Sequence, residues 1–149
     1  MARLDNWQNN LSALIEDKRA EAFDFPSWNC LMWAFASIEA VTGRDLGVKY
    51  RGKYKNELGA SRLLKRVDDV TTSQALLEKY LGEPRPVAFA RHGDIVLVDP
   101  VGTGLELPSD IELFGPVPGV CYGATSFFVG EFGLVQVETL RLGQAIWVS

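Results

Sequence analysis

The sequence CLMWAFASIEAVTG, from Cys30 to Gly43, is apolar on nearly every side. A run of this kind is typical of a helix that is buried on most of its faces. Ser27 or Asn29 can cap its first turn with a side-chain oxygen, and Gly43 can end it in a left-handed conformation. We therefore predict a helix over Cys30–Thr42 as the central element of the fold.

Three further helices are predicted from hydrophobic spacing. The apolar residues of Leu4–Phe23 recur mostly at intervals of three and four. We expect Phe25–Pro26 to end this helix, because the residue before a proline avoids the α region. The other two helices are predicted over Glu57–Val67 and Ser73–Leu81, before Glu83–Pro84–Arg85–Pro86 breaks the helical pattern.

Short β-rich runs follow this break, separated by turns such as the one predicted over Pro100–Gly104. The runs are Val87–Ala90, Asp94–Asp99, Gly119–Tyr122, Ser126–Val129, Leu134–Glu138 and Ala145–Val148. Helices followed by strands predict an α+β fold, with a helical half at about 1–82 and a β-rich half at about 87–149. In this fold the helix that begins at Cys30 packs on a small C-terminal antiparallel sheet. The length of 149 residues is that of a single domain spanning 1–149.

The composition excludes several classes of protein. The chain has 15 basic and 19 acidic residues and a net charge of −4, which argues against a nucleic-acid binder whose whole surface is basic. Met1–Arg19 lacks the pattern of a secretory signal, and no apolar run approaches the roughly 18 residues that cross a bilayer. We therefore expect a soluble protein made in the cytoplasm. The acidic residues show no metal-ligand spacing and His92 is the only histidine, so no metal site and no cofactor are expected.

Cys30 is the leading candidate for a catalytic residue. The first turn of a helix favours a thiolate, and its free N–H groups can stabilise an oxyanion beside the sulfur. The alternative is a small buried apolar residue in a helix that is apolar anyway. A cysteine nucleophile also needs a base, and His92 is the one imidazole available. The alternative for His92 is a solvated turn residue between Arg91 and Gly93.

A basic segment lies between Lys49 and Arg66. Seven basic residues lie in it with only Glu57 opposing them, and Tyr50 and Tyr54 are interleaved. We call these seven residues the basic segment: Lys49, Arg51, Lys53, Lys55, Arg62, Lys65 and Arg66. It is interpreted either as a surface for phosphate or an acidic partner, or as an ordinary solvated face.

The order of three features resembles that of the NlpC-type papain-like cell-wall peptidases. These features are a cysteine at a helix start, a later strand that begins with Gly-Asp, and then a strand that begins with Gly-Val. The counterparts here are Asn29–Cys30, Gly93–Val98 and Gly119–Gly123. The whole chain also resembles a family of small proteins of tailed phages and prophages. The matching features include Arg51–Gly52–Lys53–Tyr54, the run Phe128–Val135 and the ending Ala145–Val148. In such phages the gene tends to lie among the tail-tip genes.

The departures from the superfamily pattern concern its catalytic residues. The family's usual His-Asp-Cys is Trp28–Asn29–Cys30 here, and Val117 aligns with the position of the superfamily's histidine. Under this alignment His92 lies at the other end of the hairpin, on the order of 15 Å or more away, so a direct Cys30–His92 pair is not expected. Cys121 is expected to face the same way as Val117, which argues against a disulfide with Cys30.

Three functions follow from the resemblance. The first is a structural component of a phage tail tip or baseplate, with a degenerate peptidase-like fold. It would reside in the virion and contact other tail proteins through the basic segment. The first alternative is an active cysteine peptidase or amidase that uses Cys30 on host peptidoglycan. The second alternative is a tail-assembly chaperone.

Overall fold

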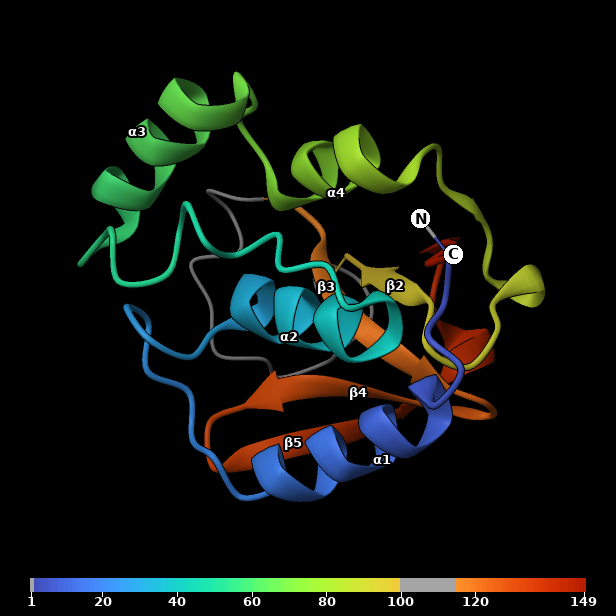
Figure 1. Cartoon of the computed structure of the whole chain (residues 1–149). Coiled ribbons are helices and arrows are strands. Elements are labelled where there is room, and N and C mark those ends of the chain that lie inside the picture. The colour runs from blue at the N-terminus through green and yellow to red at the C-terminus, as the bar shows by residue number, and fades with distance from the viewer. Residues whose placement is uncertain (1, 100–114) are drawn as a thin grey trace.

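Four α-helices come first in the chain and six antiparallel strands follow them, as the computed structural model shows for residues 2–99 and 115–149 (Figure 1). This arrangement confirms the α+β fold. The helices are α1 (Trp7–Lys18), α2 (Cys30–Thr42), α3 (Glu57–Asp68) and α4 (Ser73–Leu81). The strands are β1 (Arg85–Pro86), β2 (Ile95–Val98), β3 (Val117–Tyr122), β4 (Thr125–Gly130), β5 (Gly133–Glu138) and β6 (Gln144–Ile146). Two 3₁₀ helices, η1 (Val87–Phe89) and η2 (Thr139–Arg141), lie before β2 and before β6.

The strands form one sheet in the order β1-β6-β2-β3-β4-β5. Within it β3 lies between β2 and β4, so that Val120 is level with Ile95 on one side and with Phe127 on the other. Pairing with β4 covers only the second half of β3, from Val120 onward. Pro118, which has no N–H to donate, therefore occupies the part of β3 that is not paired with β4.

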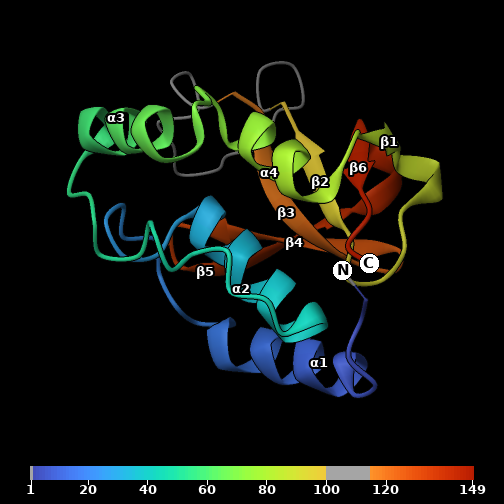
Figure 2. The ribbon, with the colours of Figure 1, turned by 45° about the horizontal axis from the view of Figure 1, so that its top comes forward.

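Helix α2 lies against one face of this sheet, and α1 packs on α2 from the outside (Figure 2). Eight of the thirteen residues of α2 are buried. Trp33 is fully buried, and its indole Nε1 donates to the carbonyl oxygen of Phe127 at 3.0 Å. Burial of a large apolar side chain contributes roughly 1.5–3 kcal/mol. The central position expected for this helix is therefore confirmed, with both of its ends as predicted.

The opposite face of the sheet is also buried. Its apolar cluster consists of Val96, Val98, Val117, Cys121, Phe128, Val137, Leu142 and Ala145. We call these residues the second cluster. Since both faces of β2 are covered, its sequence is a continuous apolar run instead of an alternating one. Gly119 is required beside this cluster, because a Cβ there would lie 2.5 Å from the ring of Phe128.

The predicted extent of the first helix is wrong at both ends. We expected a helix over Leu4–Phe23, and the structure forms one over Trp7–Lys18. At the start, Leu4 donates its N–H to the carbonyl oxygen of Val41, and a turn over Asp5 and Asn6 leads into the helix. At the end, the carbonyl oxygen of Arg19 accepts from Leu134 of β5, so tertiary pairing stops the helix well before Phe25–Pro26.

The strand predicted over Val87–Ala90 is also wrong, because these residues form the 3₁₀ turn η1. The ladder between β1 and β6 covers only Arg85 and Pro86. Ala90 then donates its N–H back to the carbonyl oxygen of Val87 at 2.9 Å. The turn packs Val87 and Ala90 against the second cluster. The turn predicted over Pro100–Gly104 lies outside the described residues.

Candidate functional site

Cys30 is the first residue of α2, and Asn29 caps the helix as predicted. The Asn29 backbone is extended, with φ −138° and ψ −179°. Its side-chain Oδ1 accepts from the N–H groups of Leu31 at 3.1 Å and Met32 at 3.0 Å. Two of the free N–H groups of the first turn are therefore already committed to the cap.

The thiol of Cys30 is neutral at physiological pH. Burial raises its pKa to about 12, and the nearby N–H groups of Leu31 and of Cys30 itself offset this only in part. The side chain packs against the second cluster, which contains Val117 and Cys121. The expectation that the helix start favours a thiolate is therefore wrong, because desolvation outweighs the helix dipole at this position. Cys30 and Cys121 are both free thiols.

Tyr54 is the residue at this site that the sequence did not single out. The Asn29 amide Nδ2 donates to the phenol oxygen of Tyr54 at 2.6 Å and to the carbonyl oxygen of Phe25 at 2.7 Å. The rings of Tyr54 and Phe25 meet edge to face, with centroids 5.7 Å apart. Burial raises the pKa of Tyr54. The only signal for this role was the Arg-Gly-x-Tyr segment that carries Tyr54.

His92 does not meet Cys30. Its neighbour Gly93 lies against the far end of α2, where a Cβ on Gly93 would be 3.3 Å from the Val41 side chain. Val41 lies eleven residues after Cys30, which is about 16 Å along a helix. The imidazole packs instead on Tyr122 at the end of β3, with ring centroids 5.2 Å apart. The predicted separation of Cys30 and His92 is therefore confirmed.

Val117 lies at the opposite end of β3 from that imidazole, five residues or about 17 Å before Tyr122. It belongs to the second cluster, on which Cys30 packs. The position at which the resemblance placed a base is therefore occupied by an aliphatic side chain, which cannot accept a proton.

The Gly93–Asp94 pair of the resemblance has a structural role. Asp94 is fully buried, and its Oδ1 accepts from Arg3 Nη2 at 2.9 Å and from the Val148 N–H at 2.9 Å. Its Oδ2 accepts from the Arg91 N–H at 2.8 Å. One carboxylate thus joins the N-terminal segment, the turn before β2 and the C-terminal segment, and the two chain ends lie side by side in Figure 1 and Figure 2.

All seven side chains of the basic segment are exposed. The interleaved tyrosines are buried instead: Tyr50 donates to the carboxylate of Asp68, and Tyr54 contacts Asn29. Two acidic residues outside the basic segment neutralise part of its positive charge. Asp45 forms a bidentate ion pair with Arg51, and Asp69 pairs with Lys65. The seven basic side chains therefore form an exposed face, and the two buried tyrosines do not contribute to it.

Residues 2–99 and 115–149 contain no group of three or more histidine, cysteine or acidic side chains that could hold a metal ion. Over the same ranges, no helix is both long and apolar enough to span a membrane.

Comparison with known proteins gives one family. The model of a family described as a domain of unknown function (DUF6950) matches residues 2–148, nearly the whole chain. No curated protein and no solved structure matches the chain.

Proposed function

The chain belongs to the DUF6950 family, and we propose that it is a non-catalytic structural component of a phage tail tip or baseplate. Its fold would be a peptidase-like fold that has lost its catalytic set. One observation carries the non-catalytic part: Cys30 packs on a cluster that contains Val117, while Gly93, the neighbour of the single histidine, lies against Val41, about 16 Å further along α2.

The protonation state and surroundings of Cys30 favour a structural role over hydrolysis. Burial raises the pKa of Cys30 to about 12, so the thiol and not the thiolate is present at pH 7. The loss of a positioned base removes a further factor of roughly 10²–10⁴. The cap also commits the Leu31 and Met32 N–H groups, which are then not free to stabilise an oxyanion. A hydrolase built on this site would have a neutral thiol in place of a thiolate and no histidine beside it.

The location in a tail rests on the resemblance to small tailed-phage proteins. The basic segment is the proposed contact surface, since its seven side chains are exposed and the protein as a whole is acidic. A surface of this charge suits an acidic face on a neighbouring tail protein, and steering of that kind weakens as salt screens the charges.

Mass spectrometry of purified virions tests the structural role. We expect the chain in intact particles at a fixed ratio to the other tail proteins. Its presence in infected cells but absence from virions would assign it instead to assembly, as a tail chaperone. Phage that carry Arg62→Glu should incorporate less of the chain, whereas Arg141→Glu makes the same charge change at an exposed position outside the basic segment and should incorporate normally.

An active peptidase or amidase is the second candidate, favoured by the position of Cys30 at the start of α2. Incubation of peptidoglycan fragments with the protein and with Cys30→Ser decides between the two. We expect no product from either protein, while a Cys30-dependent product would overturn the structural proposal. The circular dichroism of the variant should match that of the wild type, so that a missing product cannot be assigned to unfolding.

A further inference from the structure

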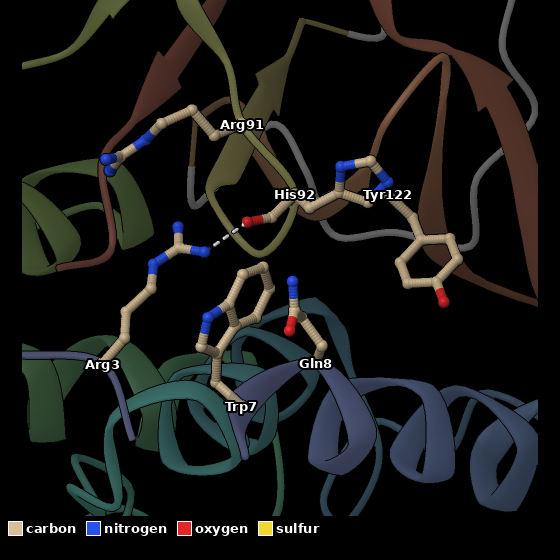
Figure 3. Close-up of a pocket in the computed structure, with 6 residues that line it drawn as sticks. All are labelled: Arg3, Trp7, Gln8, Arg91, His92 and Tyr122. Carbon is tan, nitrogen blue, oxygen red and sulfur yellow. Dashed lines mark hydrogen bonds between the residues drawn. The ribbon is translucent and has the colours of Figure 1, made fainter. Parts of the chain in front are cut away.

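A cavity of about 570 Å³ lies between the start of α1 and the sheet, at the far end of α2 from Cys30 (Figure 3). It is lined by side chains from four segments of the chain: Arg3, Trp7, Gln8, Arg91, His92 and Tyr122. Its volume is within the range of sites that hold a small molecule or a few residues of a peptide. None of the roles assigned above uses this cavity.

The charge on its walls is positive. Arg3 and Arg91 contribute two guanidinium groups, and the buried carboxylate of Asp94 balances one of them. Arg3 donates to Asp94, to the His92 carbonyl oxygen at 2.6 Å and to the Val148 carbonyl oxygen at 2.7 Å. These contacts fix the guanidinium and still leave two of its five N–H groups for a ligand. The walls therefore carry a net charge of about one, which suits a monoanion better than a phosphate dianion.

The other walls are aromatic and are held in place. The Arg3 guanidinium lies 4.3 Å from the centroid of Trp7. The Tyr122 phenol shares a hydrogen bond of 2.6 Å with Ser12, which fixes its ring beside the imidazole of His92. These rings offer apolar surface next to the positive groups.

Two polar side chains on the walls remain available. The Gln8 amide and the His92 imidazole form no hydrogen bond with other residues in the described part of the chain, and both side chains lie at the cavity in Figure 3. The Arg91 guanidinium lies over the Trp147 ring, 4.5 Å from its centroid, and its Nη1 forms no hydrogen bond with the described residues. Helix α1, which begins at Trp7, has no side-chain cap and no acidic residue in its first turn, so its dipole adds to the positive potential.

We propose that this cavity binds a carboxylate attached to an apolar or aromatic group. The carboxylate would contact the free N–H groups of Arg3 and Arg91, and the apolar part would lie on Trp7 and Tyr122. Gln8 and His92 would supply the remaining hydrogen bonds. A small organic acid and an acidic side chain of a partner protein share this chemistry.

The test is a titration followed by NMR, using the indole N–H of Trp7, assigned with Trp7→Phe, and the His92 ring as reporters. The probe is N-acetyl-phenylalanine, and its neutral amide is the matched control. We expect saturable shifts with the acid and at least tenfold weaker binding of the amide. Equal binding of the two, or no saturable shift with the acid, would overturn the proposal. Tighter binding of phenyl phosphate would overturn the assignment to a monoanion.

Gln8→Glu tests the site without removing any contact of the fold. It places a carboxylate beside Arg3 and Arg91, so we expect it to weaken binding of the acid about tenfold or more. Asn9→Glu is the matched control, because Asn9 is exposed on the same turn of α1 but does not line the cavity. Equal weakening by the two variants would contradict the proposal.

A second probe identifies the source of the carboxylate. The peptide acetyl-Gly-Phe-Glu-Phe-Gly-amide carries its only carboxylate on a side chain. Saturation by this peptide at a concentration similar to that of the free acid assigns the cavity to a protein partner. Saturation by the free acid alone assigns it to a small organic acid. Either result keeps the carboxylate site, and failure of both probes removes it, whatever the virion experiment shows.

Discussion

Arg3 and Asp94 form an ion pair of 2.9 Å between the segment before α1 and the turn before β2. The carboxylate of Asp94 is fully buried, and the Arg3 side chain is 15% exposed. The same carboxylate oxygen accepts from the N–H of Val148. Ninety-one residues separate the pair in the sequence, so this contact closes the fold at the point where its two ends meet.

Asp94→Ala should lower the free energy of unfolding by about 3–5 kcal/mol, because it leaves the Arg3 guanidinium and the Val148 N–H without their shared acceptor. Urea unfolding followed by tryptophan fluorescence measures this loss. Asp5→Ala is the control, since Asp5 is an exposed carboxylate of the same N-terminal segment, and it should change stability by less than about 0.5 kcal/mol. Similar losses in the two variants would show that Asp94 does not join the chain ends.

Asn29→Asp should destabilise the protein by roughly 1–3 kcal/mol, although aspartate is as good a helix cap as asparagine. The amide Nδ2 donates to the carbonyl oxygen of Phe25, and a carboxylate would place two acceptors against each other there. Tyr54→Phe removes only the phenol partner of Asn29 and should cost about 0.5–1.5 kcal/mol. Thermal unfolding of the two variants checks this order, and a more stable Asn29→Asp would contradict it.

Cys30 should resist alkylation by iodoacetamide at pH 8, since its pKa is raised to about 12. The raised pKa also predicts the sign of a pH effect. The contribution of the neutral thiol to stability is complete below the pKa of an unfolded cysteine, about 8.5, and is lost as pH rises from there toward 12. Wild type should therefore lose stability relative to Cys30→Ser over this interval, and parallel curves would refute the raised pKa of Cys30.

The lowered pKa of Asp68 predicts that the protein loses stability as pH falls, which is the opposite of the effect expected for Cys30. Burial alone would raise its pKa, but hydrogen bonds from Tyr50, Tyr80 and Lys79 outweigh burial and hold the pKa below its usual value. Stability from this group is present above the unfolded pKa of about 3.9 and is lost as pH falls through the lower folded pKa. Wild type should lose stability relative to Asp68→Asn between about pH 5 and pH 2.

Asp69→Asn is the control for this acid effect. The pKa of Asp69 is also lowered, by its ion pair with Lys65, but the side chain is exposed and solvent screens the pair. Its effect on acid unfolding should be the smaller of the two. An equal effect of both substitutions would mean that the Asp68 network contributes nothing specific.

Local sequence was sufficient where one segment contains its own signal. The helix over Cys30–Thr42 has a capping asparagine before it and a glycine after it, and both ends formed as predicted. The helix over Ser73–Leu81 also formed as predicted, between Thr72 and Gly82. Caps act within a few residues, so neighbouring residues decide such ends.

Local sequence failed where a distant strand determines the backbone hydrogen bonds. The periodicity of Leu4–Phe23 continues past Lys18, but the carbonyl oxygen of Arg19 pairs with Leu134 of β5. The apolar run Val87–Ala90 has the composition of a strand, but pairing with β6 ends at Pro86. Neither partner can be identified from the segment itself.

The sequence by itself determined the fold class and the central helix. It also limited any imidazole base to one residue, His92. The separation of His92 and Cys30 was predicted only with the help of the resemblance, whose alignment placed His92 at the other end of the hairpin. Only the tertiary structure decided the chemical state of Cys30, since desolvation comes from the side chains of the second cluster that pack around it. The same holds for the cavity at Trp7, where four separate segments bring two guanidinium groups, an imidazole and two aromatic rings to one place. Charge, burial and hydrogen bonding at a site depend on residues far apart in the chain, and only packing brings them together.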